Sequence, residues 1–140
     1  MKIFICCSKW FYTQIPPIKT ELESYGHIIT LPNSYEKPLK EEEIKSDSTL
    51  EGHALWKASM IRKQRVKVEN NNAILVLNFN KNGQENYIGG ATFLEMYEAF
   101  NLNKNIYLFN PIPQNMLYDE INAFRPIIIN GDLTKIKLLV

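Results

Sequence analysis

The fold is decided by residues 73–111, which read AILVLNFNKNGQENYIGGATFLEMYEAFNLNKNIYLFNP. The run 73–79 is apolar almost throughout and lacks polar alternation, as is typical of a parallel strand covered on both faces. A long polar loop with two adjacent glycines follows, then a helical pattern over 92–103 and another apolar run over 105–110. Strand, loop, helix and strand in this order predict a parallel βαβ unit, with the loop at the carboxyl edge of the sheet over a ligand cleft.

The rest of the chain repeats this alternation. Short apolar runs predict three more strands, at 2–7, 27–31 and 126–130. Helical patterns predict further helices at 16–25, 49–69 and 116–124. For residues 32–47, which carry two prolines and a Glu/Lys run, we expect an excursion with about one turn of helix. Strands alternating with helices predict a three-layer α/β sandwich around a five-stranded, mainly parallel sheet.

Two of the predicted helices have an apolar face that should pack on the sheet. In the helix over 92–103, we expect Phe93, Tyr97 and Phe100 to be buried, with Met96 alongside. In the helix over 49–69, the residues near one apolar face are Leu50, Ala54, Ala58, Ile61 and Val68.

The composition limits the class of protein. A chain of 140 residues suits a single domain, and an apolar fraction of 45% is enough for a packed core. The net charge of +1 gives no broad basic face, so we expect no nucleic-acid polymer as a partner. A local basic cluster is interpreted as a solvated helix face; its members are Lys57, Arg62, Lys63, Arg65 and Lys67.

Targeting and redox features predict a cytoplasmic protein that contacts no membrane. No charged-then-apolar leader opens the chain, and no apolar run approaches the roughly 18 residues of a membrane span. The cysteines, Cys6 and Cys7, are adjacent and poorly placed to pair, and we interpret both as small core residues. Without a spaced Cys/His signature or a G-x-G-x-x-G fingerprint, we expect neither a metal nor another cofactor. The lone His53 is interpreted as structural.

Glu95 is the residue on which the functional interpretation depends. It falls in the first turn of the predicted helix after a buried strand, at the edge where open α/β sheets bind ligands. Thr92-Phe93-Leu94-Glu95 is also a capping box, in which Thr92 caps the helix and Glu95 reaches back to its amide. The alternative is a carboxylate nucleophile, kept ionised by the helix N-terminus, that attacks a sugar C1 carbon as a base leaves.

Other candidate ligand contacts lie in segments that follow predicted strands. Gly89 and Gly90 let a backbone approach a ligand closely and leave amides free for an anion, or they form a tight turn with positive φ. Ser8 suits a phosphate or hydroxyl group, or it caps a turn. Trp10 and Phe11 suit stacking on a nucleobase, or they pack under the long loop. Of the three consecutive aromatic residues that begin at Trp10, at least one should be exposed.

Three segments resemble the nucleoside 2-deoxyribosyltransferase superfamily, small flavodoxin-like α/β proteins that include nucleotide N-glycosidases. Trp10-Phe11 is similar to the aromatic base-binding segment of some members, and Asn72-Ala-Ile-Leu-Val-Leu resembles their D-A-(apolar) strand. Residues 90–95, Gly-Ala-Thr-Phe-Leu-Glu, resemble D-S-G-T-x-x-E, and residues 103–107 resemble the later G-K-P-(apolar) strand. The resemblance implies a flavodoxin-like fold, Glu95 as the nucleophile, and a homodimer or larger homo-oligomer in which a neighbour completes the site.

The chain departs from this motif at three positions. The aspartate six residues before the nucleophile falls on Gly89, the aspartate that opens the strand falls on Asn72, and the motif glycine falls on Ala91. In the family, those acids help to bind the sugar or to protonate the leaving base. The candidates to replace them lie in the preceding loop and are Glu85, Asn86 and Tyr87.

Three functional hypotheses follow, and the least favoured of them is a purely structural oligomeric domain that binds no nucleotide. The first is an enzyme that hydrolyses, or less readily transfers, the N-glycosidic bond of a nucleoside or nucleotide, with Glu95 as the catalytic residue. The second is a non-catalytic nucleotide-binding module, a sensor or interaction domain that has lost the family's acidic residues. The apolar end, Leu138-Leu139-Val140, suits an oligomer interface or a packed final strand. The residues expected to contact the ligand are Ser8, Trp10, Phe11, Asn86, Tyr87, Gly89, Gly90 and Thr92.

Overall fold

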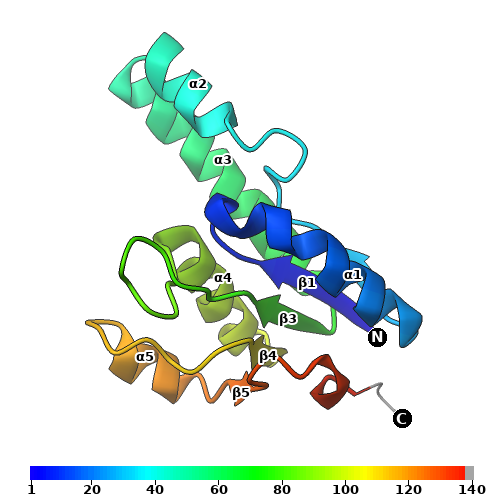
Figure 1. The fold of residues 1–140 in the computed structure, drawn as a ribbon. Helices are drawn as coiled ribbons and strands as arrows, with labels where there is room; N and C mark the ends of the chain where they lie inside the picture. Colours follow the sequence, from blue (N-terminus) through cyan, green and yellow to red (C-terminus); the bar gives the residue numbers. More distant parts are fainter. Residues whose placement is uncertain (138–140) are drawn as a thin grey trace.

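Five parallel strands form one sheet in the computed structural model, which describes residues 1–137 (Figure 1). The strands are β1 (Lys2–Cys6), β2 (Ile28–Thr30), β3 (Ala73–Val76), β4 (Asn105–Leu108) and β5 (Ile127–Ile128). They pair in the order β2-β1-β3-β4-β5, and each pair is parallel. This is the strand order of flavodoxin-like doubly wound folds, so the predicted α/β fold class is confirmed. The predicted segment Leu138-Leu139-Val140 lies outside the described residues.

Helices connect the strands and cover both faces of the sheet (Figure 1). The α-helices are α1 (Ile15–Ser24), α2 (Lys40–Asp47), α3 (Leu50–Glu69), α4 (Gly90–Asn101) and α5 (Tyr118–Ala123). The described residues also form two short 3-10 helices, which are η1 (Lys9–Gln14) and η2 (Leu133–Lys135). No helix within residues 1–137 combines the length and the apolarity that crossing a membrane would require.

The sheet has a hydrophobic core on each face, because successive side chains of a strand point to opposite sides. Ile5 and Leu75 belong to the core that α1, η1 and η2 cover. Phe4 and Cys6 belong to the other core, which includes residues from α4, α5 and the last turn of α3. The strands are therefore buried on both faces, as the unbroken apolar run of β3 predicts. Both cysteines are free and buried, which confirms their interpretation as core residues.

The order of the strands reverses between β1 and β3, since the chain passes from β1 to β2 and then crosses to the other side. Their register, from Ile3 opposite Ala73 to Cys6 opposite Val76, brings the carboxyl ends of both strands to the same edge. In open α/β sheets, ligands bind outside the carboxyl ends at such a switch point. The segments that follow Cys6 and Val76 are therefore placed to form a site.

A pair of asparagines closes the neighbouring part of this edge, between β3 and β4. The side chain of Asn78 is fully buried and donates to the carbonyls of Asn110 and Pro111, both at 3.0 Å. It also accepts from the Asn110 amide at 2.8 Å, and the Asn110 side chain donates to the Asn78 carbonyl at 3.0 Å. The protein's own groups satisfy each other here, so the space for a ligand lies on the β1 side.

Helices α2 and α3 form a hairpin that projects beyond the sheet (Figure 1). The prediction of about one helical turn in residues 32–47 is too short, because α2 has eight residues. The predicted apolar face of α3 does not pack as expected, since Val68 is its one buried residue and Leu50 is 91% exposed. The cause is the placement of the helix, because only its C-terminal turn reaches the core.

The buried face of α4 also differs from the prediction. Tyr97 and Phe100 are about half exposed, whereas a row at helical spacing faces the protein interior. This row consists of Thr92, Glu95, Met96 and Ala99. Two polar residues therefore occupy the buried side of α4, which a choice based on hydrophobicity alone does not predict.

Leu75→Ala should destabilise the protein by about 2–5 kcal/mol, because Leu75 is fully buried in the middle of the central strand and its truncation leaves a cavity. The matched control is Leu55→Ala on the projecting hairpin, where the side chain is 66% exposed and the change should stay within about 0.5 kcal/mol. Urea unfolding of both variants measures this difference. Equal destabilisation would contradict the described packing of the hairpin.

Candidate functional site

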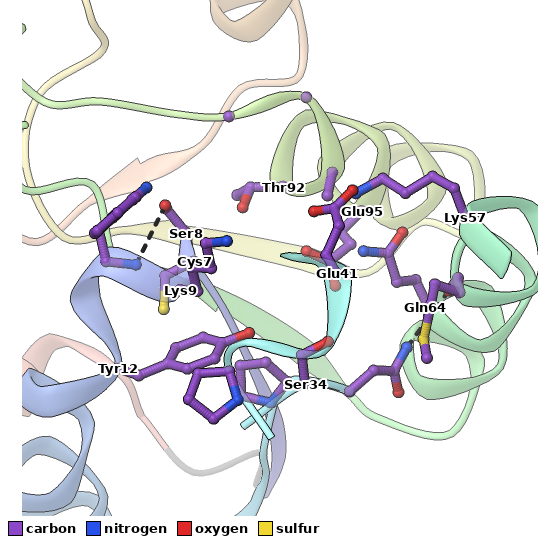
Figure 2. Close-up of a pocket in the computed structure, with 18 of the residues that line it drawn as sticks. Cys7, Ser8, Lys9, Tyr12, Ser34, Glu41, Lys57, Gln64, Thr92 and Glu95 are labelled. Carbon is purple, nitrogen blue, oxygen red and sulfur yellow. Dashed lines mark hydrogen bonds and ion pairs between the residues drawn. The ribbon is translucent and has the colours of Figure 1, made fainter. Parts of the chain in front are cut away.

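A cavity of about 260 Å³ lies at the carboxyl edge of the sheet. Its walls come from η1 and the two residues before it, the loop 32–38, both helices of the projecting hairpin, the segment that leads into α4, and the first turns of α4. Figure 2 shows side chains from these elements directed into the same space. The cavity therefore combines the sheet edge, where the fold predicts a ligand, with a hairpin whose role the sequence does not predict.

Most of the predicted ligand contacts meet in this cavity, and two do not. Phe11 is buried in the core, where its ring contacts Phe79 edge-on at a centroid distance of 5.4 Å. The backbone amide of Asn86 donates to Asn80 Oδ1 at 3.1 Å, which closes the long loop. The predicted residues that line the cavity are Ser8, Trp10, Tyr87, Gly89, Gly90, Thr92 and Glu95.

Glu95 has a buried carboxyl group, and the residue is 4% exposed. Burial raises its pKa to about 8, and the Cys6 thiol and the ammonium groups of Lys67 and Lys57 only partly oppose this rise. The prediction that the helix N-terminus keeps Glu95 ionised is therefore wrong. The helix begins at Gly90, so Glu95 lies in the second turn, where the influence of the terminal amides has fallen off and desolvation dominates.

The capping-box interpretation of Glu95 is also wrong. The N-cap residue of α4 is Gly89, and no side chain caps this helix. Thr92 is a helical residue and is 3% exposed. Figure 2 shows Thr92 and Glu95 side by side on the wall of the cavity. Their position at this wall, rather than a capping role, is what the structure assigns to both.

The two glycines before α4 do not form a turn with positive φ. Gly89 has an extended backbone with φ −82° and ψ 172°, and Gly90 opens the helix. A Cβ on Gly89 would lie 3.3 Å from the Tyr87 hydroxyl, whereas one on Gly90 would meet nothing within 4 Å. Neither position carries a side chain where the first amides of α4 lack a partner within the helix, which favours the interpretation as a close approach to a ligand.

Trp10 confirms that one aromatic residue after β1 is exposed. Its side chain is 62% exposed at the cavity, and the hydroxyl of Ser8 accepts a hydrogen bond from its backbone amide at 3.4 Å. Ser8 thus caps η1 and also lines the cavity, which combines the two predicted roles. Because Phe11 is in the core, Trp10 is the remaining candidate of the predicted pair for stacking on a flat ligand.

The hairpin contributes site residues that the sequence did not single out. The carboxylate of Glu41 in α2 accepts hydrogen bonds from His53 Nε2 at 3.0 Å and from Lys57 Nζ at 3.3 Å. Burial raises the pKa of Glu41, but His53 and Lys57 outweigh this effect, so its pKa lies below the usual value. The prediction of a purely solvated basic face is thus wrong for Lys57, which lines the cavity, and for Lys67, whose ammonium group donates to the Leu31 carbonyl at 2.6 Å.

Gln64 from α3 is the second such residue. Its Oε1 atom is the one buried side-chain oxygen or nitrogen of residues 1–137 that lacks a hydrogen-bond partner, and the residue lines the cavity. A buried carbonyl oxygen left without a donor destabilises a protein by about 1–3 kcal/mol. No pattern in the sequence signals this role, because a single glutamine in a polar helix is ordinary.

No family model matches this chain, and no curated protein matches its sequence. Within residues 1–137, no group of three or more histidine, cysteine, aspartate or glutamate side chains is arranged to hold a metal ion. The chemistry of the site therefore has to be argued from its geometry and charge.

Glu95→Gln should stabilise the protein, and the stabilisation should grow as the pH rises from about 4.5 to about 8. The unfolded chain releases the Glu95 proton near 4.5 while the folded protein holds it to about 8, so the wild type loses up to about 1.4 kcal/mol per pH unit in this interval. Denaturant unfolding at several pH values measures the difference. The control is Glu98→Gln, which removes a more exposed carboxyl from the same helix; the same trend in both would contradict the role of burial.

Proposed function

We propose that this protein cleaves the N-glycosidic bond of a nucleoside or nucleotide, with Glu95 as the nucleophile. The observation that carries the proposal is a buried carboxyl group on the wall of a cavity at the switch point of the sheet. No ion pair within residues 1–137 involves Glu95, so no cation in direct contact compensates the burial of its carboxyl group. Burial of an unpaired carboxyl group destabilises the folded protein. Buried titratable groups in clefts are therefore often functional, because the activity is the reason to keep them.

The proposed reaction proceeds in two displacements. The Glu95 carboxylate attacks the C1 carbon of the sugar, the C1–N bond breaks, and its electron pair leaves with the base, which takes up a proton. The resulting ester joins the sugar to Glu95. Water then attacks C1, releases the carboxylate and gives the free sugar, whereas attack by a second base would give transfer. Hydrolysis requires only water as the acceptor, which favours it.

The apolar part of the cavity wall supports a nucleobase as the leaving group. Trp10, Tyr12 and Trp56 belong to it and provide flat surfaces. Aromatic rings bind flat heterocycles by offset stacking. The other apolar residues of this wall are Pro32, Pro38 and Met60.

The orphaned oxygen of Gln64 suits a donor on the same ligand. Sugar hydroxyl groups and exocyclic amino groups of bases both donate hydrogen bonds, and either would satisfy Oε1. A ligand that supplies this bond gains affinity, since the protein no longer has an unsatisfied buried acceptor.

A second candidate function is binding without turnover, and one observation favours it. Asn72 and Gly89 stand where the family that this chain resembles has two aspartates. The Asn72 side-chain oxygen accepts a hydrogen bond from the Lys2 amide at 2.8 Å, and Gly89 has no side chain, so neither acid is present. A nucleotide sensor or interaction module would keep the cavity and the stacking surface without catalysis. Under this alternative, a ligand binds saturably and no free base appears.

We also propose that the protein forms a homo-oligomer in a reducing, cytoplasmic environment. The exposed apolar residues of the hairpin, Leu50 and Leu55 among them, are the part of the described surface that suits contact with another copy. The free, buried cysteines fit a reducing compartment.

The wild type should release free base from at least one member of a panel of nucleosides, nucleoside monophosphates and NAD, and Glu95→Gln should abolish this release. Chromatography of the products measures it, with Glu98→Gln as the control that keeps activity. Release by Glu95→Gln at the wild-type rate would overturn the proposed role. Saturable binding without release by the wild type would support the binding module instead.

The pH profile of the reaction tests the role of Glu95. Since the nucleophile must be ionised and its pKa is about 8, kcat/KM should rise with pH and level off above about 8. A rate that falls through the same pH range would show that protonated Glu95 acts as a general acid.

Gln64→Leu should raise KM by about tenfold, because it removes the acceptor that the ligand completes, while the unfolding free energy should stay equal or increase. Steady-state kinetics and urea unfolding separate the two effects. A parallel loss of stability would instead indicate that Gln64 has a structural role.

A further inference from the structure

We propose that Lys57 is the general acid of the cavity, which protonates the base as the C1–N bond breaks. This inference rests on the proposed function, because it names the source of the proton that the leaving base takes up there. The two positions at which the resembled family has acids cannot supply it, since Asn72 is an amide and Gly89 has no side chain. A base that leaves without a proton carries the electron pair of the broken bond as a negative charge, so a nearby acid accelerates the step.

Lys57 lies on the face of α3 that lines the cavity. Lys57, Met60 and Gln64 follow one another at intervals of three and four residues, which places them on one side of the helix, and all three line the cavity. The neighbouring Trp56 lines it too. Trp56 and Met60 belong to the apolar part of the wall, where the base is proposed to stack. The side chain of Lys57 therefore starts beside the place of the base.

The ammonium group of Lys57 also lies close to the proposed nucleophile. It is one of the two ammonium groups that act against the raised pKa of Glu95. The other, that of Lys67, donates to the Leu31 carbonyl at 2.6 Å and is not part of the cavity lining. Figure 2 shows the Lys57 side chain extended from α3 toward Glu41 and Glu95. Lys57 thus connects the wall for the base with the carboxyl group that attacks C1.

An ion pair with Glu41 holds the ammonium group in place. Lys57 Nζ lies 3.3 Å from Glu41 Oε2, and His53 Nε2 lies 3.0 Å from the same oxygen atom. Although burial raises the pKa of Glu41, His53 and Lys57 outweigh this effect, so the carboxylate is ionised and acts as a fixed acceptor. An ammonium group has three N–H donors, and the pair with Glu41 uses one of them. The other two can donate to a base.

Other proton donors of the cavity are less well placed. The ammonium groups of Lys9 and Lys81 lie over the Trp10 ring, 5.6 and 5.3 Å from its centroid. Neither is among the charges that lower the pKa of the proposed nucleophile. Burial raises the pKa of Tyr12, which makes its hydroxyl group a weaker acid. Of these groups, Lys57 alone combines a place on the base side with an effect on the nucleophile.

The proton follows a closed cycle in this mechanism. As Glu95 attacks C1, the electron pair of the C1–N bond moves to the base, and one N–H bond of Lys57 breaks so that its proton joins the base nitrogen. The electron pair of that N–H bond stays on the Lys57 amine. When water attacks C1 and releases Glu95, the amine takes a proton from that water, and the ammonium group is restored. The net reaction consumes one water molecule and yields the free base and the free sugar.

Lys57→Met, which removes the ammonium group from a side chain of similar length, should lower kcat for base release by about a hundredfold or more. Lys57→Arg should lose about as much, because a guanidinium group keeps the charge and the pair with Glu41 but does not give up a proton. Chromatography of the products of the full chain, with a nucleotide that the wild type cleaves, measures both. The control Lys63→Met removes a charge from the same helix outside the cavity lining and should keep the wild-type rate.

A substrate whose leaving group needs no proton separates acid catalysis from damage to the fold. The para-nitrophenyl riboside releases a stable phenolate ion, so both Lys57 variants should cleave it within about threefold of the wild type, whereas Glu95→Gln should abolish its cleavage. A wild-type rate of base release in Lys57→Arg, or an equal loss for both substrates in Lys57→Met, would overturn the role of Lys57 and leave cleavage by Glu95 intact. If the wild type releases no base from any member of the panel, the proposed function itself fails, and the role of Lys57 fails with it.

Discussion

The parallel pairing of β1 with β3 is the constraint on which the rest of the structure depends. It brings the ends of both strands to one edge, so that the segment after Cys6 and the long loop after β3 lie beside each other. Beyond the ends of β3 and β4, the hydrogen bonds of Asn78 with Asn110 and Pro111 close the neighbouring part of this edge. The cavity therefore forms at the switch point, where the order of the strands reverses between β1 and β3.

Burial of Glu95 opposes stability, and the fold tolerates it because the surrounding core is large. Both faces of β3 are covered, and the buried row of α4 includes Met96 and Ala99 beside the carboxyl group. These apolar contacts hold the helix in a register that places Glu95 toward the strands, where the Cys6 thiol and two ammonium groups lower its pKa only in part. An unfavourable environment for a carboxylate is thus maintained by packing, which is a frequent arrangement at catalytic sites.

The sequence predicts the fold better than the site, and the reasons are physical. The unbroken apolar run of 73–79 could be recognised as a central strand because burial on both faces leaves no alternation. The sequence pattern predicts that this helix begins at residue 92, whereas α4 begins at Gly90. Glu95 therefore lies in the second turn and not the first, and the effect of the helix amides falls off within one turn, so the predicted ionisation of Glu95 is wrong. Gln64 and Glu41 were missed since they reach the cavity only through the hairpin, whose direction depends on tertiary contacts.

The charges of the cavity define what a ligand must supply. Five lysines and glutamates line it, and three of them are neutralised within the protein, because Lys57 pairs with Glu41 and Lys9 pairs with Glu42. Lys81 and Glu95 are the two that have no such partner in the described chain. Under the proposed function, positive charge develops at C1 of the sugar as the base leaves. That developing charge would stabilise the carboxylate form of Glu95, so cleavage of the bond would itself lower the pKa that burial has raised.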